Sequence, residues 1–337
     1  MRSLLFALAL VAAITAASTL SLDGKMMEEW KMFKAKHGKV YHGGDIEEKF
    51  RLKIYNHNKA MIARHNHLAD IGHYSYFLKM NQFGDLFHSE LFATTNRSPK
   101  NQRIHKSGAS FIKPEGFETP TKVDWRTKGA VTKVKDHGNC LFGDWAFTAT
   151  GALEGQHFRK TGKLVSLSEQ NLLDCTYGQK YYSEGCSGGF VDGAFEYVRD
   201  NRGLDTESGY PFNYNQTEVD KICKFKQASV GATAKGFVDL PKGDEDALAV
   251  AVAAHGPISV YIDTTHPSIL FYDYGIYDEP RCSPNSTSNY MLLVGYAPGY
   301  WMLKNSWGTG WGMDGYIKMK RGGYNCGIAE LASYPLV

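Results

Sequence analysis

The sequence predicts an α+β fold in which a helical N-terminal segment precedes a domain that is helical first and rich in strands later. Apolar residues over 24–92 recur with helical spacing, and shorter helical patterns occur between residues 119 and 256. Strand-like runs follow at 258–262, 290–296, 301–304 and 316–320. The chain has 337 residues, of which 43% are hydrophobic, so it can bury a sizeable core in one or two domains.

The N-terminus has the pattern of a secretory signal peptide. Arg2 precedes an apolar run from Leu4 to Ile14, and small residues follow it. This pattern predicts a signal peptide over residues 1–17, with a buried N-terminal helix as the alternative. The run is too short to span a bilayer, so we expect no membrane span and a secreted or lysosomal location. On that route, three sequons become candidate glycosylation sites: Asn96, Asn215 and Asn285.

Residues 18–118 are expected to form a helical prosegment that ends in a linker. Asp45 and Glu48 have the spacing of a helix N-cap and its capping box. Six residues recur at steps of four, four, three, four and four, which places them on one stripe of a helix. They are Glu47, Arg51, Tyr55, Asn58, Ile62 and Asn66. A stripe of mixed polar and apolar side chains indicates packing against another element, with its polar members hydrogen-bonded.

A polar stretch interrupted by Pro99 follows, and it is typical of an exposed linker. The sequence leaves open whether this linker is cut or joins two permanent domains. Beyond it we expect four helices, each with a start or stop signal such as an N-cap serine or a terminal glycine. Their predicted spans are Trp145–Arg159, Ser168 (as N-cap) to Asp174, Val191–Val198 and Ala247–Ala254.

Composition excludes several classes of function. The formal net charge of +3 is too small to indicate nucleic acid or an anionic membrane as a partner. The sequence contains no basic cluster with interleaved aromatics, no phosphate-binding glycine loop and no Cys-x-x-Cys pair. We therefore expect no nucleic-acid partner, no cofactor and no metal, and we expect a monomer.

Several motifs in order along the chain resemble one known family. The helical stripe is similar to the ERFNIN motif of cathepsin L-like propeptides, with Tyr55 in place of the phenylalanine. Other matching segments are Val123–Arg126, Trp145–Phe147, Gly185–Gly189 and Asn305–Gly308. The chain thus resembles the papain family, and cathepsin L within it, over nearly its whole length after the signal peptide. The resemblance implies a papain-like two-lobed α+β domain over 119–337, after an inhibitory-type propeptide over 18–118.

The resemblance also implies how the cysteines pair. Six cysteines allow 15 connectivities, and the family favours one of them. The implied pairs are Cys140–Cys186, Cys175–Cys223 and Cys282–Cys326. A mature enzyme of this family needs a seventh, unpaired cysteine as its nucleophile, and this chain has none.

The family's chemistry uses a thiolate, a histidine that activates it and an asparagine that orients the histidine. The resemblance places Asp144, Tyr290 and Asn305 at these three positions, and His137 where the family has an oxyanion-binding glutamine. The loop from Cys140 is also one residue longer than in the family.

Each residue that differs from the family has two possible roles, one functional and one structural. Asp144 is either a catalytic carboxylate, paired with His137, or a helix N-cap held ionised by the helix dipole; we favour the N-cap. Tyr290 is either an acid–base group or a buried strand aromatic, and its high intrinsic pKa favours the second. We expect His137 in a surface loop and Asn305 as a structural group hydrogen-bonded near Trp307.

The substrate groove is implied in the same way. Gly188 and Gly189 match the wall that binds substrate backbone, Trp307 matches a shielding tryptophan, and Tyr261 is expected to fill the main specificity pocket.

The favoured hypothesis is a family member without peptidase activity that acts by binding, as a decoy, a regulator or a storage protein. Its partners would be polypeptides or active protease relatives, together with its own propeptide. The alternatives are a hydrolase with Asp144-based chemistry, and an active cysteine endopeptidase if the sequence from Cys140 to Asp144 is in error.

Overall fold

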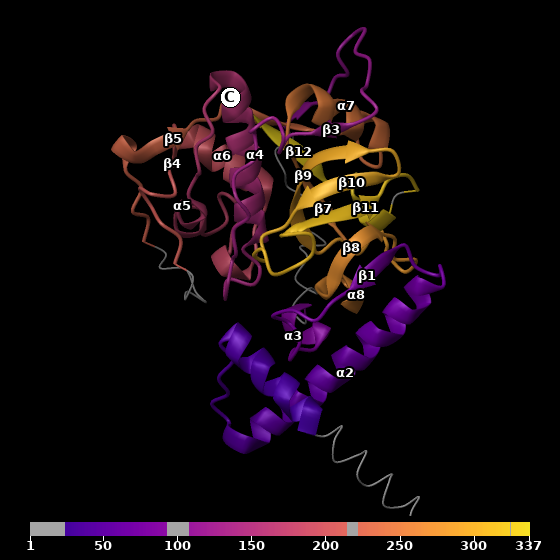
Figure 1. The fold of residues 1–337 in the computed structure, drawn as a ribbon. Helices are drawn as coiled ribbons and strands as arrows, with labels where there is room; N and C mark the ends of the chain where they lie inside the picture. Colours follow the sequence, from indigo (N-terminus) through magenta and orange to yellow (C-terminus); the bar gives the residue numbers. More distant parts are fainter. Residues whose placement is uncertain (1–23, 93–107, 214–221, 324) are drawn as a thin grey trace, which may run out of the picture. The chain divides into compact units, whose positions relative to one another are not determined.

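A computed structural model of the chain describes residues 24–92, 108–213, 222–323 and 325–337 (Figure 1). The predicted signal peptide, Asn96 and Asn215 lie outside these residues. Two compact units make up the described part: residues 24–61 with 82–87, and residues 62–81 with the rest of the chain from 88. No described helix is long and apolar enough to cross a membrane.

The first unit contains a helix over residues 24–37 and the N-terminal part of α2 (Gly44–Asp70). Trp30 is fully buried between them, with its ring 5.3 Å from that of Tyr55. Asp45 lies inside the first turn of α2, so the predicted N-cap is wrong. Glu48 accepts hydrogen bonds from Trp30 Nε1 at 3.1 Å and from Lys34 Nζ. Its carboxylate therefore links α2 to the helix over residues 24–37 and does not cap α2.

The polar members of the helical stripe are hydrogen-bonded, which confirms that prediction. In the first unit, Asn58 Nδ2 donates to two backbone carbonyls of the loop 82–87, each at 3.0 Å. Arg51 donates to a third carbonyl of this loop at 3.2 Å, and its Nε lies 4.0 Å from the Glu47 carboxylate. In the second unit, Asn66 exchanges two hydrogen bonds of 2.8 Å with the backbone of Leu78.

The second unit is built around one large sheet with the strand order β1-β8-β11-β10-β9-β7-β12-β6-β2, and β3 also pairs with β9. These strands are β1 (Tyr76–Leu78), β2 (Ala109–Ser110), β3 (Val123–Asp124), β6 (Gly236–Asp239), β7 (Ile258–Ile262), β8 (Tyr272–Tyr277), β9 (Asn289–Ala297), β10 (Tyr300–Lys304), β11 (Tyr316–Lys320) and β12 (Ala332–Leu336). The four predicted strands are all present as β7, β9, β10 and β11.

One part of the helical prediction over 24–92 is wrong. Residues 76–78 form strand β1, which pairs antiparallel with β8 about two hundred residues later. Tyr76 and Leu78 are buried on this strand, and the residue between them is not. Periodicity over so short a stretch could not reveal a partner so distant in the sequence.

Besides the large sheet, the second unit contains further helices. They are α3 (His88–Phe92), α4 (Asp144–Thr161), α5 (Glu169–Cys175), α6 (Val191–Asp200), α7 (Glu245–His255) and α8 (Pro267–Leu270), with a small sheet of β4 (Leu204–Asp205) and β5 (Val230–Ala232) and the 3₁₀ turns η2 (Gly185–Ser187), η3 (Gln227–Ser229) and η4 (Asn325–Gly327). Ser168 caps α5 by accepting the Asn171 N–H, as predicted, and Gly256 ends α7.

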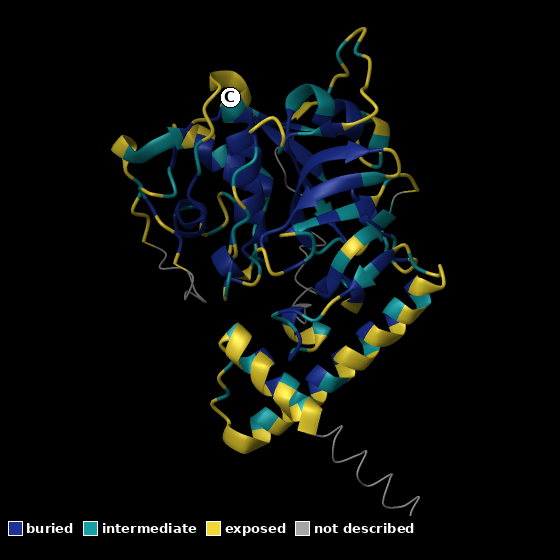
Figure 2. Cartoon of the chain, viewed as in Figure 1, coloured by how far each residue is buried: buried dark blue, intermediate teal, exposed yellow. Residues whose placement is uncertain are grey.

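Helix α4 lies between the helical and the sheet-rich parts of this unit (Figure 1). It packs against α5 and α6 on one side and against β7, β9 and β12 on the other. Both α4 and β9 are buried along most of their length (Figure 2). The predicted α+β class is therefore confirmed, and the N-terminus of α4 faces the sheet.

All six cysteines are paired as predicted, in the disulfides Cys140–Cys186, Cys175–Cys223 and Cys282–Cys326. The chain therefore carries no thiol.

Candidate functional site

The loop before α4 ends one residue earlier than the sequence predicted. Gly143, with φ −84° and ψ −3°, is the N-cap of α4, and Asp144 is the first helical residue. A Cβ on Gly143 would lie 2.7 Å from the Cys140 sulfur, so only glycine fits at this position. The prediction that Asp144 is the N-cap is therefore wrong, because Gly143 takes that position.

The Asp144 carboxyl is buried against the sheet. It is 6% exposed, and it accepts the backbone N–H of Tyr290, together with the N–H groups of Asp144 itself and Trp145. No cation in the described part of the chain stabilises its charge. Burial raises the pKa of Asp144 to about 7 despite these three hydrogen bonds. The expectation that the helix terminus holds this carboxylate ionised is thus also wrong.

Tyr290 is a buried strand residue, as predicted. It is 5% exposed on β9, and its ring centroid lies 4.3 Å from that of Tyr261, its partner on β7. The phenol oxygen accepts the backbone N–H of Val191, the first residue of α6. Burial raises the pKa of Tyr290 well above its usual value of 10, so the phenol stays neutral at any physiological pH. Tyr290 therefore spans from the sheet to a helix N-terminus.

His137 is buried, which contradicts the prediction of a surface loop. It is 4% exposed, because its backbone N–H donates to the Ser306 carbonyl at 3.0 Å and holds the loop inward. Its Nδ1 lies 3.3 Å from the Gly138 carbonyl, and its Nε2 has no hydrogen-bond partner among the described residues. Burial lowers the pKa of His137, which favours the neutral form of the ring. Asp144 is held by backbone amides and not by this ring.

Asn305 is buried beside the tryptophans, as predicted, but only half of its amide is satisfied. Its Oδ1 accepts the Ser306 N–H at 2.8 Å, whereas its Nδ2 finds no acceptor within the described ranges. Trp307 follows it, 4% exposed, with its ring 5.1 Å from that of Trp311.

The glycine wall rests on the first aromatic residue of α4. Trp145 Nε1 donates to the Gly185 carbonyl at 3.1 Å. A Cβ on Gly189 would lie 2.5 Å from the Trp145 indole, so the backbone lies flat on the ring. Gly188 and Gly189 stay partly exposed, and this backbone could hydrogen-bond an extended peptide.

The groups at this site do not make a nucleophile and a base. The carboxyl is held by three backbone amides, the phenol cannot take up a proton from it, and every cysteine is in a disulfide. None of the site residues makes up a metal-binding group.

Sequence reasoning missed a buried charge cluster beneath this site, which we call the Lys135 cluster. Lys135 Nζ lies 2.7 Å from the Glu169 carboxylate and 3.9 Å from that of Glu154, and Lys304 is the second cation. These residues line a small cavity together with Asn305. A glutamate within the apolar part of the α4 sequence was the signal available for it.

Two known protein families match the chain. The family described as papain family cysteine protease matches residues 119–336, and the cathepsin propeptide inhibitor domain matches residues 30–91. The chain is 50% identical to the cathepsin L-like peptidase of Aedes aegypti over 97% of this chain and 98% of that protein. It is 48% identical to cathepsin L1 of Drosophila melanogaster, covering 98% of this chain and 90% of that one.

Among solved structures, the fold is similar to the digestive procathepsin L 3 of the Tenebrio molitor larval midgut. The TM-score is 0.83 at 40% identity, over 93% of this chain and 99% of that one. Procathepsin L2 from the same source gives a TM-score of 0.84 at 35% identity, over 93% and 100% of the two chains. The predicted papain-like fold with a preceding propeptide domain is confirmed by these matches.

Proposed function

This chain belongs to the papain family of cysteine proteases as a cathepsin L-like member, and we propose that it has no peptidase activity and acts by binding polypeptides. Asp144 and Tyr290 stand, on this proposal, at the positions of the family's nucleophile and base. The observation that carries the proposal is the hydrogen bond from the Tyr290 backbone N–H to the Asp144 carboxyl. In this bond the Asp144 carboxyl, at the start of α4, accepts a backbone hydrogen bond from β9 and so has a structural role.

The energetics of catalysis support the proposal. Removing one member of a nucleophilic triad typically costs about 10⁶ in rate, and further losses add little. Here the nucleophile and the base are both replaced, and the neutral buried His137 offers no side-chain amide for an oxyanion. A carboxyl with a pKa of about 7 is only partly ionised at neutral pH and is a poor nucleophile toward a peptide bond.

The close contact between two tyrosines favours a restricted groove. The rings of Tyr261 and Tyr290 pack at a tilt of 32° beside the N-terminus of α6, which is where we place the main specificity pocket. A bound polypeptide would therefore be held chiefly by backbone contacts to Gly188 and Gly189, with little room for a large side chain. Its partners would be extended polypeptides or active protease relatives that present one.

We place the domain boundaries at residues 18–118 for the prosegment and 119–337 for the mature domain, with secretion or lysosomal delivery directed by residues 1–17. Asn285 is exposed in a turn, which suits a glycosylation site. With no activity to restrain, the prosegment would act mainly in folding.

The direct test combines three measurements on purified protein with the prosegment intact and removed. A fluorogenic peptide panel measures turnover, an epoxide probe for thiols measures covalent labelling, and a peptide library on beads measures binding. We expect binding without turnover or labelling. Labelling would mean that the sulfurs are misassigned and the protein is an active cysteine peptidase.

The Asp144→Ala variant separates the remaining alternative. Turnover that this variant abolishes would support a carboxylate-based hydrolase and overturn the proposal. A matched control is Asp273→Ala, which changes a carboxylate on β8 away from the α4 terminus.

A further inference from the structure

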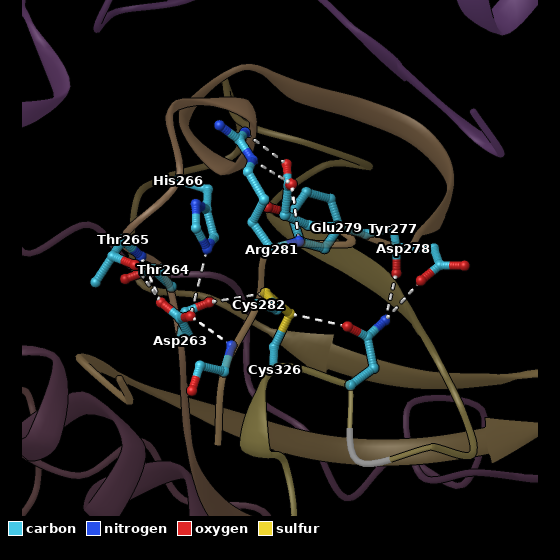
Figure 3. The surroundings of a disulfide bond; sticks show 12 residues. Asp263, Thr264, Thr265, His266, Tyr277, Asp278, Glu279, Arg281, Cys282 and Cys326 are labelled. Atoms are coloured by element: carbon cyan, nitrogen blue, oxygen red, sulfur yellow. Dashed lines mark hydrogen bonds and ion pairs between the residues drawn. A yellow bond between two sulfur atoms is a disulfide. The ribbon is translucent and has the colours of Figure 1, made fainter. Parts of the chain in front are cut away.

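A second cluster of reactive side chains lies outside the proposed groove, around the Cys282–Cys326 disulfide (Figure 3). Asp263 follows β7, His266 precedes α8, and Cys282 lies in the loop after β8. One carboxylate oxygen, one ring nitrogen and the Cys282 sulfur lie within 4.8 Å of one another. These three side chains, the Asp263 cluster, are the group of metal-ligating residues found in the described part of the chain.

The Asp263 carboxylate is held in a fixed orientation. Asp263 is fully buried, and its Oδ1 accepts the Thr265 N–H at 2.8 Å and the Thr265 hydroxyl at 2.6 Å. Its Oδ2 accepts the Ser283 N–H at 2.9 Å. A carboxylate oxygen has a further lone pair, so these bonds leave Oδ2 able to bind a cation. Such outer hydrogen bonds are what orient a carboxylate ligand in metal sites.

His266 points its free ring nitrogen at the same place. Its Nε2 is buried and has no hydrogen-bond partner within the residues that the structure describes. It lies 3.5 Å from Asp263 Oδ2. Two ligands that each lie ~2.0–2.2 Å from a tetrahedral Zn²⁺ are separated by roughly 3.3–3.6 Å, so this pair already has the right spacing. A bound ion would also satisfy a buried nitrogen that is otherwise unpaired.

Neighbouring charges do not occupy this position. Arg281 is the nearby cation in Figure 3, and its guanidinium is engaged by Glu279, with bonds of 2.8 and 3.1 Å. The negative charge of Asp263 therefore faces hydrogen-bond donors, His266 and also His88 of α3, whose Nε2 lies 2.8 Å from the Thr264 carbonyl.

We propose that Asp263, His266 and Cys282 form a redox-gated site for a zinc-like divalent cation, which becomes competent when the Cys282–Cys326 disulfide is reduced. A thiolate, and not a disulfide sulfur, is a strong ligand for such an ion. A dithiol or phosphine reductant breaks the sulfur–sulfur bond, gives two electrons and is itself oxidised, and two protons complete two thiols. On binding, the Cys282 thiol releases its proton to solvent.

This proposal goes beyond the proposed function, because the cluster lies outside the groove residues and its readout is metal binding. It also revises the expectation of no metal site, which rested on the absence of a Cys-x-x-Cys pair in the sequence. Folding brings the aspartate and histidine beside the Cys282–Cys326 disulfide.

The test uses the full chain with Cys326→Ser, which frees the Cys282 thiol and leaves the other two disulfides intact. We expect this variant to bind one Co²⁺ per chain with a thiolate-to-cobalt charge-transfer band, and the wild type to show no such band. Adding His266→Asn to this variant should weaken binding at least tenfold. The matched control is Cys282→Ser, which frees the other sulfur of the same bridge and should bind at least tenfold more weakly.

Absence of the band in folded Cys326→Ser, or equal affinity with and without His266, would overturn the proposal. If this variant does not fold, wild-type protein is reduced stepwise and its zinc content is compared with the thiols mapped by mass spectrometry. Zinc should appear only in molecules in which Cys282 is reduced. Equal zinc content in oxidised and reduced molecules would refute the proposal by this second route.

Discussion

The buried Asp144 carboxyl should make the protein less stable as the pH rises, and Asp144→Asn should remove this dependence. Its folded-state pKa of about 7 is higher than the unfolded value of 3.8. The folded state therefore favours the protonated form, and this contribution is present at low pH and lost as the pH rises from about 4 to above 7. A shift of about three pKa units corresponds to on the order of 4 kcal/mol at the upper limit.

Asparagine has the shape of a protonated aspartate, so the variant should resemble the wild type near pH 4 and exceed its stability above pH 7. The assay is urea unfolding with disulfides intact at several pH values, compared as the difference between the two proteins. Asp200→Asn is the control, because ion pairs with Arg199 and Lys180 lower the pKa of this exposed carboxyl and give a small trend of opposite sign. A difference between wild type and Asp144→Asn that does not vary with pH would refute the reasoning.

Three further predictions concern packing and hydrogen bonds. Lys135→Met should cost about 3–5 kcal/mol at pH 7 in urea unfolding, because it removes the cation 2.7 Å from the buried Glu169 carboxylate, and the cost should shrink at pH 5, where Glu169, with a pKa of about 7 in the wild type, is protonated in both proteins. Tyr290→Phe should cost about 1–2 kcal/mol by the same measurement, since the first amide of α6 loses its acceptor, and no loss would mean that this bond is absent. Asn58→Ala should lower the unfolding midpoint of the prosegment by removing two hydrogen bonds to backbone carbonyls, whereas Lys53→Ala on the exposed face of α2 should not.

The sequence predicted those parts of the fold whose causes are local. Strand β7 and the Ser168 cap follow from alternation and capping chemistry within a few residues, and both are present as predicted. Strand β1 was missed because its stability comes from a partner about two hundred residues away. The cysteine pairs came from family resemblance, since spacing alone leaves 15 possibilities.

The candidate site shows the same division between local and distant causes. The burial of Tyr290 follows from its own strand pattern and was predicted. The pKa of Asp144 could not be, because it depends on how completely β9 covers the start of α4. His137 was misplaced for a similar reason, since a backbone bond to Ser306 draws a polar loop inward. Desolvation depends on the assembled fold and not on neighbours in the sequence.

Asp144 at the start of α4 and Tyr290 on β9 both stabilise the fold, so on the proposed function a single substitution toward the family's residues would not restore peptidase chemistry. A cysteine at position 144 would remove the acceptor of the Tyr290 amide and would face a phenol whose pKa lies well above 10. That phenol cannot accept the thiol proton, so the sulfur would stay protonated and unreactive. A histidine at position 290 would in turn lose the bond from the first amide of α6 to the phenol. Asp144 and Tyr290 thus support each other, and the pair is held in place by the contact between α4, α6 and β9.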